Sequence, residues 1–419
     1  MSRIEQTFNK LAQSSDALQR LRSKAFDELT LLKAPSKKDE AWKYTSPKAF
    51  LEAAWDVNSS VVTSIESVVD LAKVPFAKLP SQATLLFVDG VLRSDLSTGS
   101  WSGSTLDKAP AGMFEKFETK PEFFERMNLA LLNQGTYLEI DTRSAVLPLI
   151  LIYLTTKPST ELAANYRLAI QVPTHAEASI IEVHAALEGV ATTSQIVTQV
   201  ELGANSSLKY VKVQTSSEAQ HLSSTQFRVS RDARLESTQV AFGGVLTRQN
   251  LEVTFVEEGG EAIVNGLYLG CGNEHIDNHT LIDHAVGNTT SSQLYKGVLD
   301  DNARGVFTGG VRIRKDAQKA NSSQLNNNLM LSQKAEIDTK PELEIDADDV
   351  KAAHGATIGQ INPDHVFYLQ SRALSRKQAV EMLAFGFAQD IVDRISDQTA
   401  RAELSKLVKH KFSNFKVDA

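Results

Sequence analysis

The 419-residue sequence contains a single cysteine, Cys271. A disulfide framework is therefore excluded, and so is a zinc or iron–sulfur site built only from this chain's thiolates, because such sites need several of them. Basic residues are also in deficit, with 44 Lys and Arg against 51 Asp and Glu and a formal net charge of −7. This balance argues against a nucleic-acid-binding protein, whose phosphate contacts need a basic face.

The sequence also lacks a membrane-spanning or secretory segment. Its longest apolar stretch, 145–154, contains Pro148 and is far shorter than the roughly 20 residues that cross a bilayer. Residues 1–10 are polar and have no apolar core of a signal peptide. We therefore expect no membrane association and a cytoplasmic or organelle-stromal protein with a reduced thiol.

Signatures of nucleotide-binding and acyl-transfer enzymes are missing as well. The chain has no Gly-Lys pair and hence no P-loop, so we expect that it binds no nucleotide by itself. The segment 270–272 (Gly-Cys-Gly) lacks the third glycine of a dinucleotide fingerprint, and no Gly-x-Ser-x-Gly elbow occurs.

The sequence divides into three regions. Residues 1–140 predict an N-terminal helical region, from the helical spacing of apolar residues along 4–32, with a hairpin at Asp89-Gly90. Residues 141–345 predict a β core, because short runs of alternating polarity recur between polar turns. Residues 346–419 predict a C-terminal helical domain, with Ser375 as a helix cap and an apolar face that either folds onto the core or binds a partner.

The β core contains a spacing that repeats. A small or polar turn precedes an apolar strand start at Ile180, Leu208, Leu235, Ile263 and Leu294, which lie 28, 27, 28 and 31 residues apart. Such regularity favours a solenoid, in which each coil stacks on the previous one. A large antiparallel sandwich stays open as the alternative. In the solenoid, the asparagine run 326–328 is expected at a corner.

One cluster of possible metal ligands stands out in the β core. It consists of Cys271, His275, Asp277, His279, Asp283 and His284. The local pattern is that of a strand, on which His275 and His279 would lie roughly 13 Å apart, too far for one ion. We therefore favour a structural role for these residues over a metal site.

The run 338–359, continued by Phe-Tyr-Leu-Gln-Ser-Arg at 367–372, closely resembles the SufB/SufD family of iron–sulfur cluster assembly scaffolds. The segments 277–284 and 42–44 (Trp-Lys-Tyr) resemble further parts of that family. The run 354–359 (His-Gly-Ala-Thr-Ile-Gly) is most like the SufD subunit, and the cysteines that SufB supplies near this position are absent.

This resemblance implies a fold and a set of partners. The expected fold is mainly β, with a right-handed parallel β-helix core between helical regions. The family implies pairing with a SufB-like paralogue through the β-helix and binding of a SufC-like ABC-type ATPase through the C-terminal helices. ATP hydrolysis would belong to that ATPase, so the chain is expected to be a non-catalytic scaffold subunit. The isolated chain could also form a homodimer.

The resemblance also implies functional residues. His354 matches the histidine that is thought to hold a transient, nascent iron–sulfur cluster at the interface with the paralogue, where neutral imidazole is a competent iron ligand. The expected partner-binding residues are Phe367, Tyr368, Arg372, Leu383 and Phe387.

The chain departs from its relatives at two places. Ala352 stands where many relatives have a cysteine, and Ala373 stands where they often have glycine. A thiolate at 352 therefore cannot be essential in this chain.

Two other functions are consistent with parts of the sequence. A β-helix carbohydrate-active enzyme would need acidic or basic residues gathered on one strip, whereas the acidic residues here are dispersed. A standalone metal carrier would use the cluster at 271–284, and metal bound to the isolated chain would support it.

Overall fold

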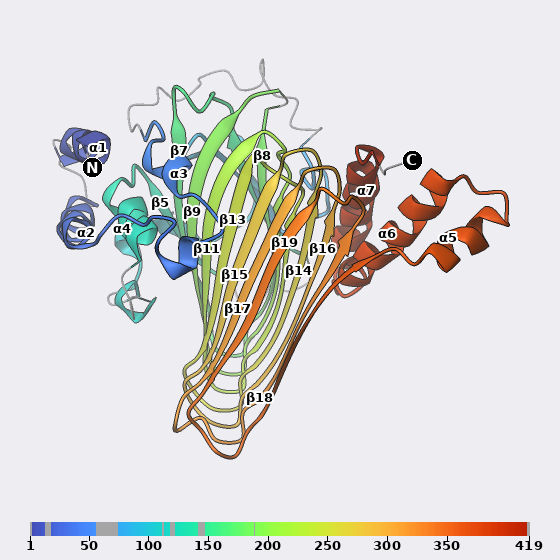
Figure 1. Ribbon diagram of the computed structural model, residues 1–419. Coiled ribbons are helices and arrows are strands. Elements are labelled where there is room, and N and C mark those ends of the chain that lie inside the picture. Colours follow the sequence, from blue (N-terminus) through green and yellow to red (C-terminus); the bar gives the residue numbers. More distant parts are fainter. Residues whose placement is uncertain are drawn as a thin grey trace.

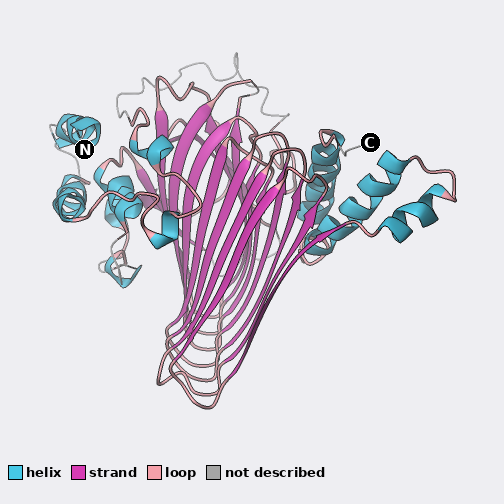
Figure 2. Ribbon diagram, in the orientation of Figure 1, coloured by secondary structure: helices cyan, strands magenta, loops and turns pink. Residues whose placement is uncertain are grey.

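The computed structural model (Figure 1) describes residues 2–12, 18–55, 74–110, 113–117, 122–140, 147–187 and 189–416. The chain is mainly β and forms a parallel β-solenoid of about seven turns with helices at both ends of the sequence. Figure 2 shows the N-terminal helices on one side of the solenoid and the C-terminal helices on the other. The predicted parallel solenoid is thus confirmed, and the antiparallel sandwich is excluded.

Two sheets form the walls of the solenoid. The first has eleven strands, in the spatial order β2 (Val91–Leu92), β1 (Ala83–Val88), β6 (Leu149–Thr155), β8 (Glu177–Ala186), β10 (Ser207–Gln214), β12 (Arg234–Ala241), β14 (Glu261–Gly270), β16 (Thr290–Leu299), β18 (Asn321–Met330) and β20 (Lys351–Gln360), with β3 (Thr98–Gly99) also paired with β1. The second has nine, in the order β19 (Glu336–Ile345), β17 (Arg304–Ile313), β15 (His275–His284), β13 (Leu246–Phe255), β11 (Ala219–Val229), β9 (Thr192–Leu202), β7 (Ala163–Val172), β5 (Gly135–Glu139) and β4 (Gly103–Thr105). The chain alternates between the sheets, so each coil contributes one strand to each wall.

The strand register of the first sheet, from β6 to β20, gives a repeat of 27 to 31 residues, close to the predicted spacing. The predicted strand starts are not all equivalent positions, because Leu208 lies beside Ala178 and not beside Ile180, and Ile263 is on the outer face. Leu208 lies beside Leu235, and Leu235 lies beside Ala262, which gives a repeat of 27 residues in these coils. At each of the predicted turns one residue has a positive φ: His175, Asn205, Asp232, Gly259 and Asn288. The corners before β8, β10, β12, β14 and β16 thus require left-handed backbone, which Gly, Asn and Asp adopt at little cost.

The asparagine run 326–328 is not at a corner, and that prediction was wrong. It lies in the middle of β18, and Asn326 and Asn328 point into the solenoid. Asn328 donates a hydrogen bond of 2.6 Å to Asn326, which also accepts one of 2.8 Å from Thr339. Because the two amide groups hydrogen-bond to each other along β18 and Asn326 also bonds across the coil to Thr339 of β19, buried asparagines are compatible with strand here.

The described part of residues 1–140 contains α1 (Ser2–Ala12), α2 (Gln19–Leu31), α3 (Lys48–Leu51) and α4 (Phe123–Ala130), together with short 3-10 turns at Glu40–Trp42, Leu106–Lys108 and Glu115–Phe117. Strands β1 and β5 of this region pair in parallel with β6 and β7, so the solenoid sheets begin before the predicted boundary at 141. The predicted hairpin joins β1 to β2, and Asp89 and Gly90 both have a positive φ. Within the described residues, no helix has the length and apolar character needed to cross a membrane.

The C-terminal region contains α5 (Pro363–Gln370), α6 (Arg376–Val392) and α7 (Gln398–Ser413). Ser375 forms a capping box with Gln378 at the start of α6. The apolar face of α6 and α7 packs on the outer surface of the first sheet, and Lys296 of β16 forms an ion pair of 2.8 Å with Asp390. The helices therefore fold onto the solenoid. Strand β20 pairs with β18, so the solenoid continues past the predicted boundary at 345.

Candidate functional site at the open end of the solenoid

The solenoid ends at β19 and β20 without a covering coil. Each is the last strand of its sheet, and within the described residues no strand pairs with its outer edge. Inner-face side chains of the last coil are consequently exposed, including Ile345 at 41% and Ile358 at 51%. Two edge strands with free backbone groups and exposed apolar side chains are a surface on which another chain can add strands.

His354 lies on this last coil, on β20. Side chains alternate along a strand, so His354 shares the inner face with Ala352, which packs against the solenoid core. His354 itself is exposed because no further coil covers it. Its ring therefore faces the open end of the solenoid, in the position that an incoming chain would cover.

Gln324 is the register neighbour of His354 in the preceding coil. Its Nε2 donates a hydrogen bond of 2.6 Å to Gln293, which in turn donates one of 2.6 Å to Thr280. Among the described residues the Oε1 atom of Gln324 is buried and has no partner. A free acceptor next to an imidazole suits an N–H of that ring, and such a bond would leave the other ring nitrogen as a ligand.

The five predicted partner-binding residues do not lie together. Phe367 and Tyr368 on α5 are 73% and 55% exposed, and the guanidinium of Arg372 lies 4.6 Å from the Tyr368 ring centroid. Leu383 and Phe387 on α6 are half-buried against the solenoid, where the Nζ of Lys296 lies 4.4 Å from the Phe387 ring centroid. Only the first three form an exposed surface.

The cluster at 271–284 is spread along β15 as the strand pattern predicted. Asp277 is buried and bridges Arg248, at 2.8 Å, and His279, at 3.0 Å. His284 is buried and contacts the hydroxyls of Thr289 and Ser291. Across the described part of the chain, no group of three His, Cys, Asp or Glu side chains could hold a metal ion.

Cys271 lies in the turn after β14, away from the open end, and is half-buried. Burial raises the pKa of its thiol, although the nearby Lys411 opposes this shift. The thiol therefore stays protonated near neutral pH and is a poor ligand.

Sequence reasoning missed a charged cluster inside the solenoid. Glu182 of β8 lies beside Lys212 of β10 in register, and their carboxylate and ammonium groups are 3.0 Å apart in complete burial. His184 contacts Glu182 at 2.6 Å, and the Tyr210 hydroxyl donates to the same carboxylate. Burial alone would raise the pKa of Glu182, but Lys212 and the hydrogen bond with His184 outweigh it and hold that pKa well below its usual range. The sequence signal that could have revealed this pair is a Glu and a Lys at positions one repeat apart, 182 and 212.

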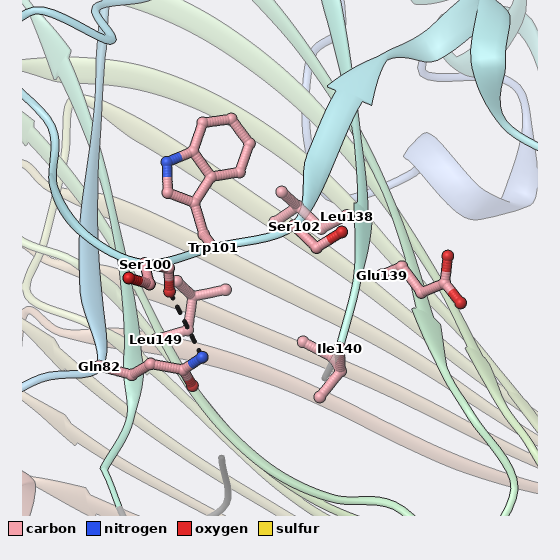
Figure 3. A pocket seen from close by; sticks show the side chains of 8 residues that line it. All are labelled: Gln82, Ser100, Trp101, Ser102, Leu138, Glu139, Ile140 and Leu149. Atoms are coloured by element: carbon pink, nitrogen blue, oxygen red, sulfur yellow. Dashed lines mark hydrogen bonds between the residues drawn. The ribbon is translucent and has the colours of Figure 1, made fainter. Parts of the chain in front are cut away.

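Two cavities lie away from His354. Figure 3 shows the smaller one, of about 200 Å³, beside Trp101 and Leu149 at the first coil. The larger one measures about 570 Å³ and lies between the N-terminal region and the outer face of the second sheet. Neither cavity is lined by His354 or by another residue of β20.

Comparison with known proteins identifies the family. Residues 154–387 match the family model described as SUF system FeS cluster assembly, SufBD core domain, and residues 4–128 match the SufBD protein N-terminal region. The chain is 31% identical over 413 residues to an iron-sulfur cluster assembly SufBD family protein of Synechocystis, covering 92% of this chain and 89% of that protein.

Two similar proteins carry the name SufD. The iron-sulfur cluster assembly protein SufD of Escherichia coli is 28% identical over 377 residues, covering 88% of this chain and 87% of its own. SufD of Bacillus subtilis is 26% identical over 290 residues, covering 68% and 66%. The chain therefore belongs to the SufBD family of the SUF iron–sulfur cluster assembly system and is SufD-like.

Proposed function

We propose that this chain is a non-catalytic scaffold subunit that presents His354 to an iron–sulfur cluster forming at the open end of the solenoid. The observation that carries this proposal is the exposed imidazole on an inner face that no coil covers. The family membership supplies the cargo, because iron–sulfur cluster assembly is what the matching family model describes.

The partner at the open end would be a SufB-like paralogue that carries cysteines. Strands of that paralogue would hydrogen-bond to the free edges of β19 and β20, and its apolar side chains would cover Ile345 and Ile358. The only thiol of this chain is at Cys271, far from β20 in the fold. Thiolate ligands of the cluster would therefore come from the partner, with His354 as the ligand from this side.

A SufC-like ATPase would dock on α5, at the exposed surface of Phe367, Tyr368 and Arg372. Leu383 and Phe387 would support this surface from behind, since they anchor α6 on β16. Because α5 directly follows β20, movement of the ATPase would act on the strand that holds His354.

The ligand role can be tested by cluster reconstitution in the complete complex of this chain, the cysteine-bearing paralogue and the ATPase. We expect His354→Ala to assemble normally and to lower the rate of cluster formation, followed by visible absorbance and by bound iron and sulfide, by about tenfold or more. The matched control is His410→Ala, an exposed histidine on α7, away from both proposed docking surfaces. Wild-type cluster formation by His354→Ala would remove the ligand role.

The two docking surfaces can be tested separately by co-purification. Ile358→Lys should abolish capture of the paralogue, because it places a charge in the apolar centre of the pairing surface, and should leave capture of the ATPase intact. Phe367→Ala combined with Tyr368→Ala should have the opposite effect. Leu31→Ala, at an exposed apolar residue of α2, serves as the control for both. Retention of the ATPase by the double variant would contradict the proposed docking on α5.

A further inference from the structure

Two segments that resemble the SufB/SufD family, 42–44 and 277–284, lie far from His354 and are joined in the structure by Arg248. Trp42, from the segment 42–44, lies against Arg248, whose guanidinium is 3.9 Å from the Trp42 ring centroid. Arg248 pairs with Asp277 of the segment 277–284 at 2.8 Å, and the Thr45 hydroxyl contacts His275 at 3.1 Å. The 570 Å³ cavity opens beside this junction, and we call it the N-terminal cavity.

The N-terminal cavity has walls from both parts of the fold. The loop and short turn at 32–42 and the first turn of α4 form one side, and the outer faces of β9, β11, β13 and β15 form the other. Its apolar surface includes Trp42, Phe124 and Leu222, all of which are buried. Its volume lies in the range of roughly 300–1,000 Å³ that is typical of small-molecule sites.

The charges in the lining do not balance. Arg248 is already neutralised by the buried Asp277. Glu125 and Glu252 also line the cavity, and within the described residues neither has an ion-pair partner. Glu125 accepts a hydrogen bond of 2.5 Å from Ser224, while its contacts with Gln226 are long, at 3.4 Å. The positive charges of Arg167 and Arg312 act on Glu125 and Glu252 from a longer distance, and Lys33 also lines the cavity, but neither carboxylate has a cation at ion-pair distance among the described residues.

The pKa values of both carboxyl groups are raised. Burial raises the pKa of Glu125 to about 7, and the charge of Glu252 adds to this shift. Burial also raises the pKa of Glu252, helped by Asp283. A positively charged ligand would reverse both shifts, since an opposite charge within a few ångströms favours the ionised form.

An independent observation points to a hydrogen-bond donor. Gln195 lines the same cavity and is only 2% exposed. Its Nε2 donates a hydrogen bond of 2.6 Å to the carbonyl of Phe124, which fixes the orientation of the amide. Its Oε1 is buried and has no partner among the described residues. A buried acceptor left without a donor is costly, so a ligand with N–H groups would satisfy it.

We propose that the N-terminal cavity binds a small organic cation, an aliphatic amine or guanidine, whose charged group lies between Glu125 and Glu252 and whose carbon chain lies on Trp42 and Phe124. A bare metal ion suits the cavity less well, because the described residues offer no group of three metal-ligating side chains. The apolar walls would also be left uncovered by an ion, whereas they match an alkyl chain.

The test is isothermal titration calorimetry on the full chain with spermidine and agmatine as probes. We expect saturable binding of at least one of them, and we expect Glu125→Gln combined with Glu252→Gln to weaken it by about tenfold or more, because the charged group of the ligand loses both opposite charges. Glu218→Gln, in the exposed turn before β11, is the matched control. Circular dichroism and a melting curve verify that the double variant folds.

Three results would overturn the proposal. They are the absence of saturable binding of both probes at millimolar concentration, unchanged affinity in the folded double variant, and displacement of the bound probe by Mg²⁺ at equal concentration. None of these experiments involves His354 or a partner, so the outcome is independent of the proposed scaffold function.

Discussion

Replacement of Lys212 by methionine is expected to destabilise the fold in a pH-dependent way. Methionine keeps the length of the side chain and removes its charge, which leaves the Glu182 carboxylate buried without its ammonium partner. Removal of one member of a buried ion pair typically costs about 3–5 kcal/mol. The Glu182 carboxyl group can limit this cost by taking up a proton. The free energy of that protonation therefore sets the upper limit of the destabilisation.

This upper limit of the destabilisation can be calculated from the pKa of glutamate in the unfolded chain. Protonation of a carboxyl whose unfolded pKa is 4.5 costs about 1.4 kcal/mol per pH unit above that value, or roughly 3.4 kcal/mol at pH 7. In the wild type the lowered pKa of Glu182 gives stability that is present above pH 4.5 and is lost as the pH falls. In Lys212→Met the folded pKa lies above 4.5 instead, so the destabilisation should grow by about 1.4 kcal/mol per pH unit, or about 2.7 kcal/mol between pH 5 and pH 7.

Urea unfolding of the full chain, followed by circular dichroism at pH 5, 6, 7 and 8, measures this effect. Lys209→Met is the matched control, because Lys209 is on the same strand but exposed, and it should stay within about 0.5 kcal/mol of wild type. Glu182→Gln combined with Lys212→Met should recover most of the loss. A loss below about 1 kcal/mol that is constant from pH 5 to 8 would refute the reasoning, because it would mean that the two groups are already uncharged in the fold.

Three further changes are expected to raise stability, each measured by the midpoint of urea unfolding. Gly386→Ala should add about 0.5–1 kcal/mol, because Gly386 is an exposed interior position of α6 with open space around it; a lower midpoint would mean that α6 is not helical there. Ala373→Gly should add about 1 kcal/mol, because Ala373 has a φ of 67°, and an unchanged midpoint would contradict that strain. Glu125→Gln should be more stable than wild type at pH 8 and equal to it below pH 4.5. The reason is that the pKa of Glu125 is raised to about 7 in the fold, so the wild type loses stability as the pH rises from 4.5 to 7. A gain in stability that is the same at both pH values would contradict the raised pKa.

The sequence was sufficient for the architecture because local chemistry repeats from coil to coil. Residues such as Asn205 and Asp232 tolerate a left-handed corner, and an apolar residue, Leu208 or Leu235, is the second residue of the strand that follows. The start of α6 could also be predicted from the sequence, because the cap at Ser375 depends only on residues close to it in the chain. In both cases the determining contacts are short-range in sequence.

What the sequence could not convey depends on partners across the coil. Asn326 and Asn328 read as turn residues, and only their hydrogen bonds to each other and to Thr339 make them strand residues. Glu182 and Lys212 are ordinary charged residues until the register places them side by side in the core. His354 could be named from resemblance, whereas its exposure on the inner face follows from the absence of a covering coil in the described chain.

The two ends of the solenoid differ in a way that limits how large an assembly can become. At the first coil, the short antiparallel strands β2, β3 and β4 border the sheets, and Trp101 packs against the core. Short antiparallel edge strands are poor templates for further pairing. If the last coils pair as proposed, each chain offers only one end for end-to-end stacking. Two solenoids that join through their last coils leave only blocked ends outward, so growth stops at a closed pair and cannot continue into a filament.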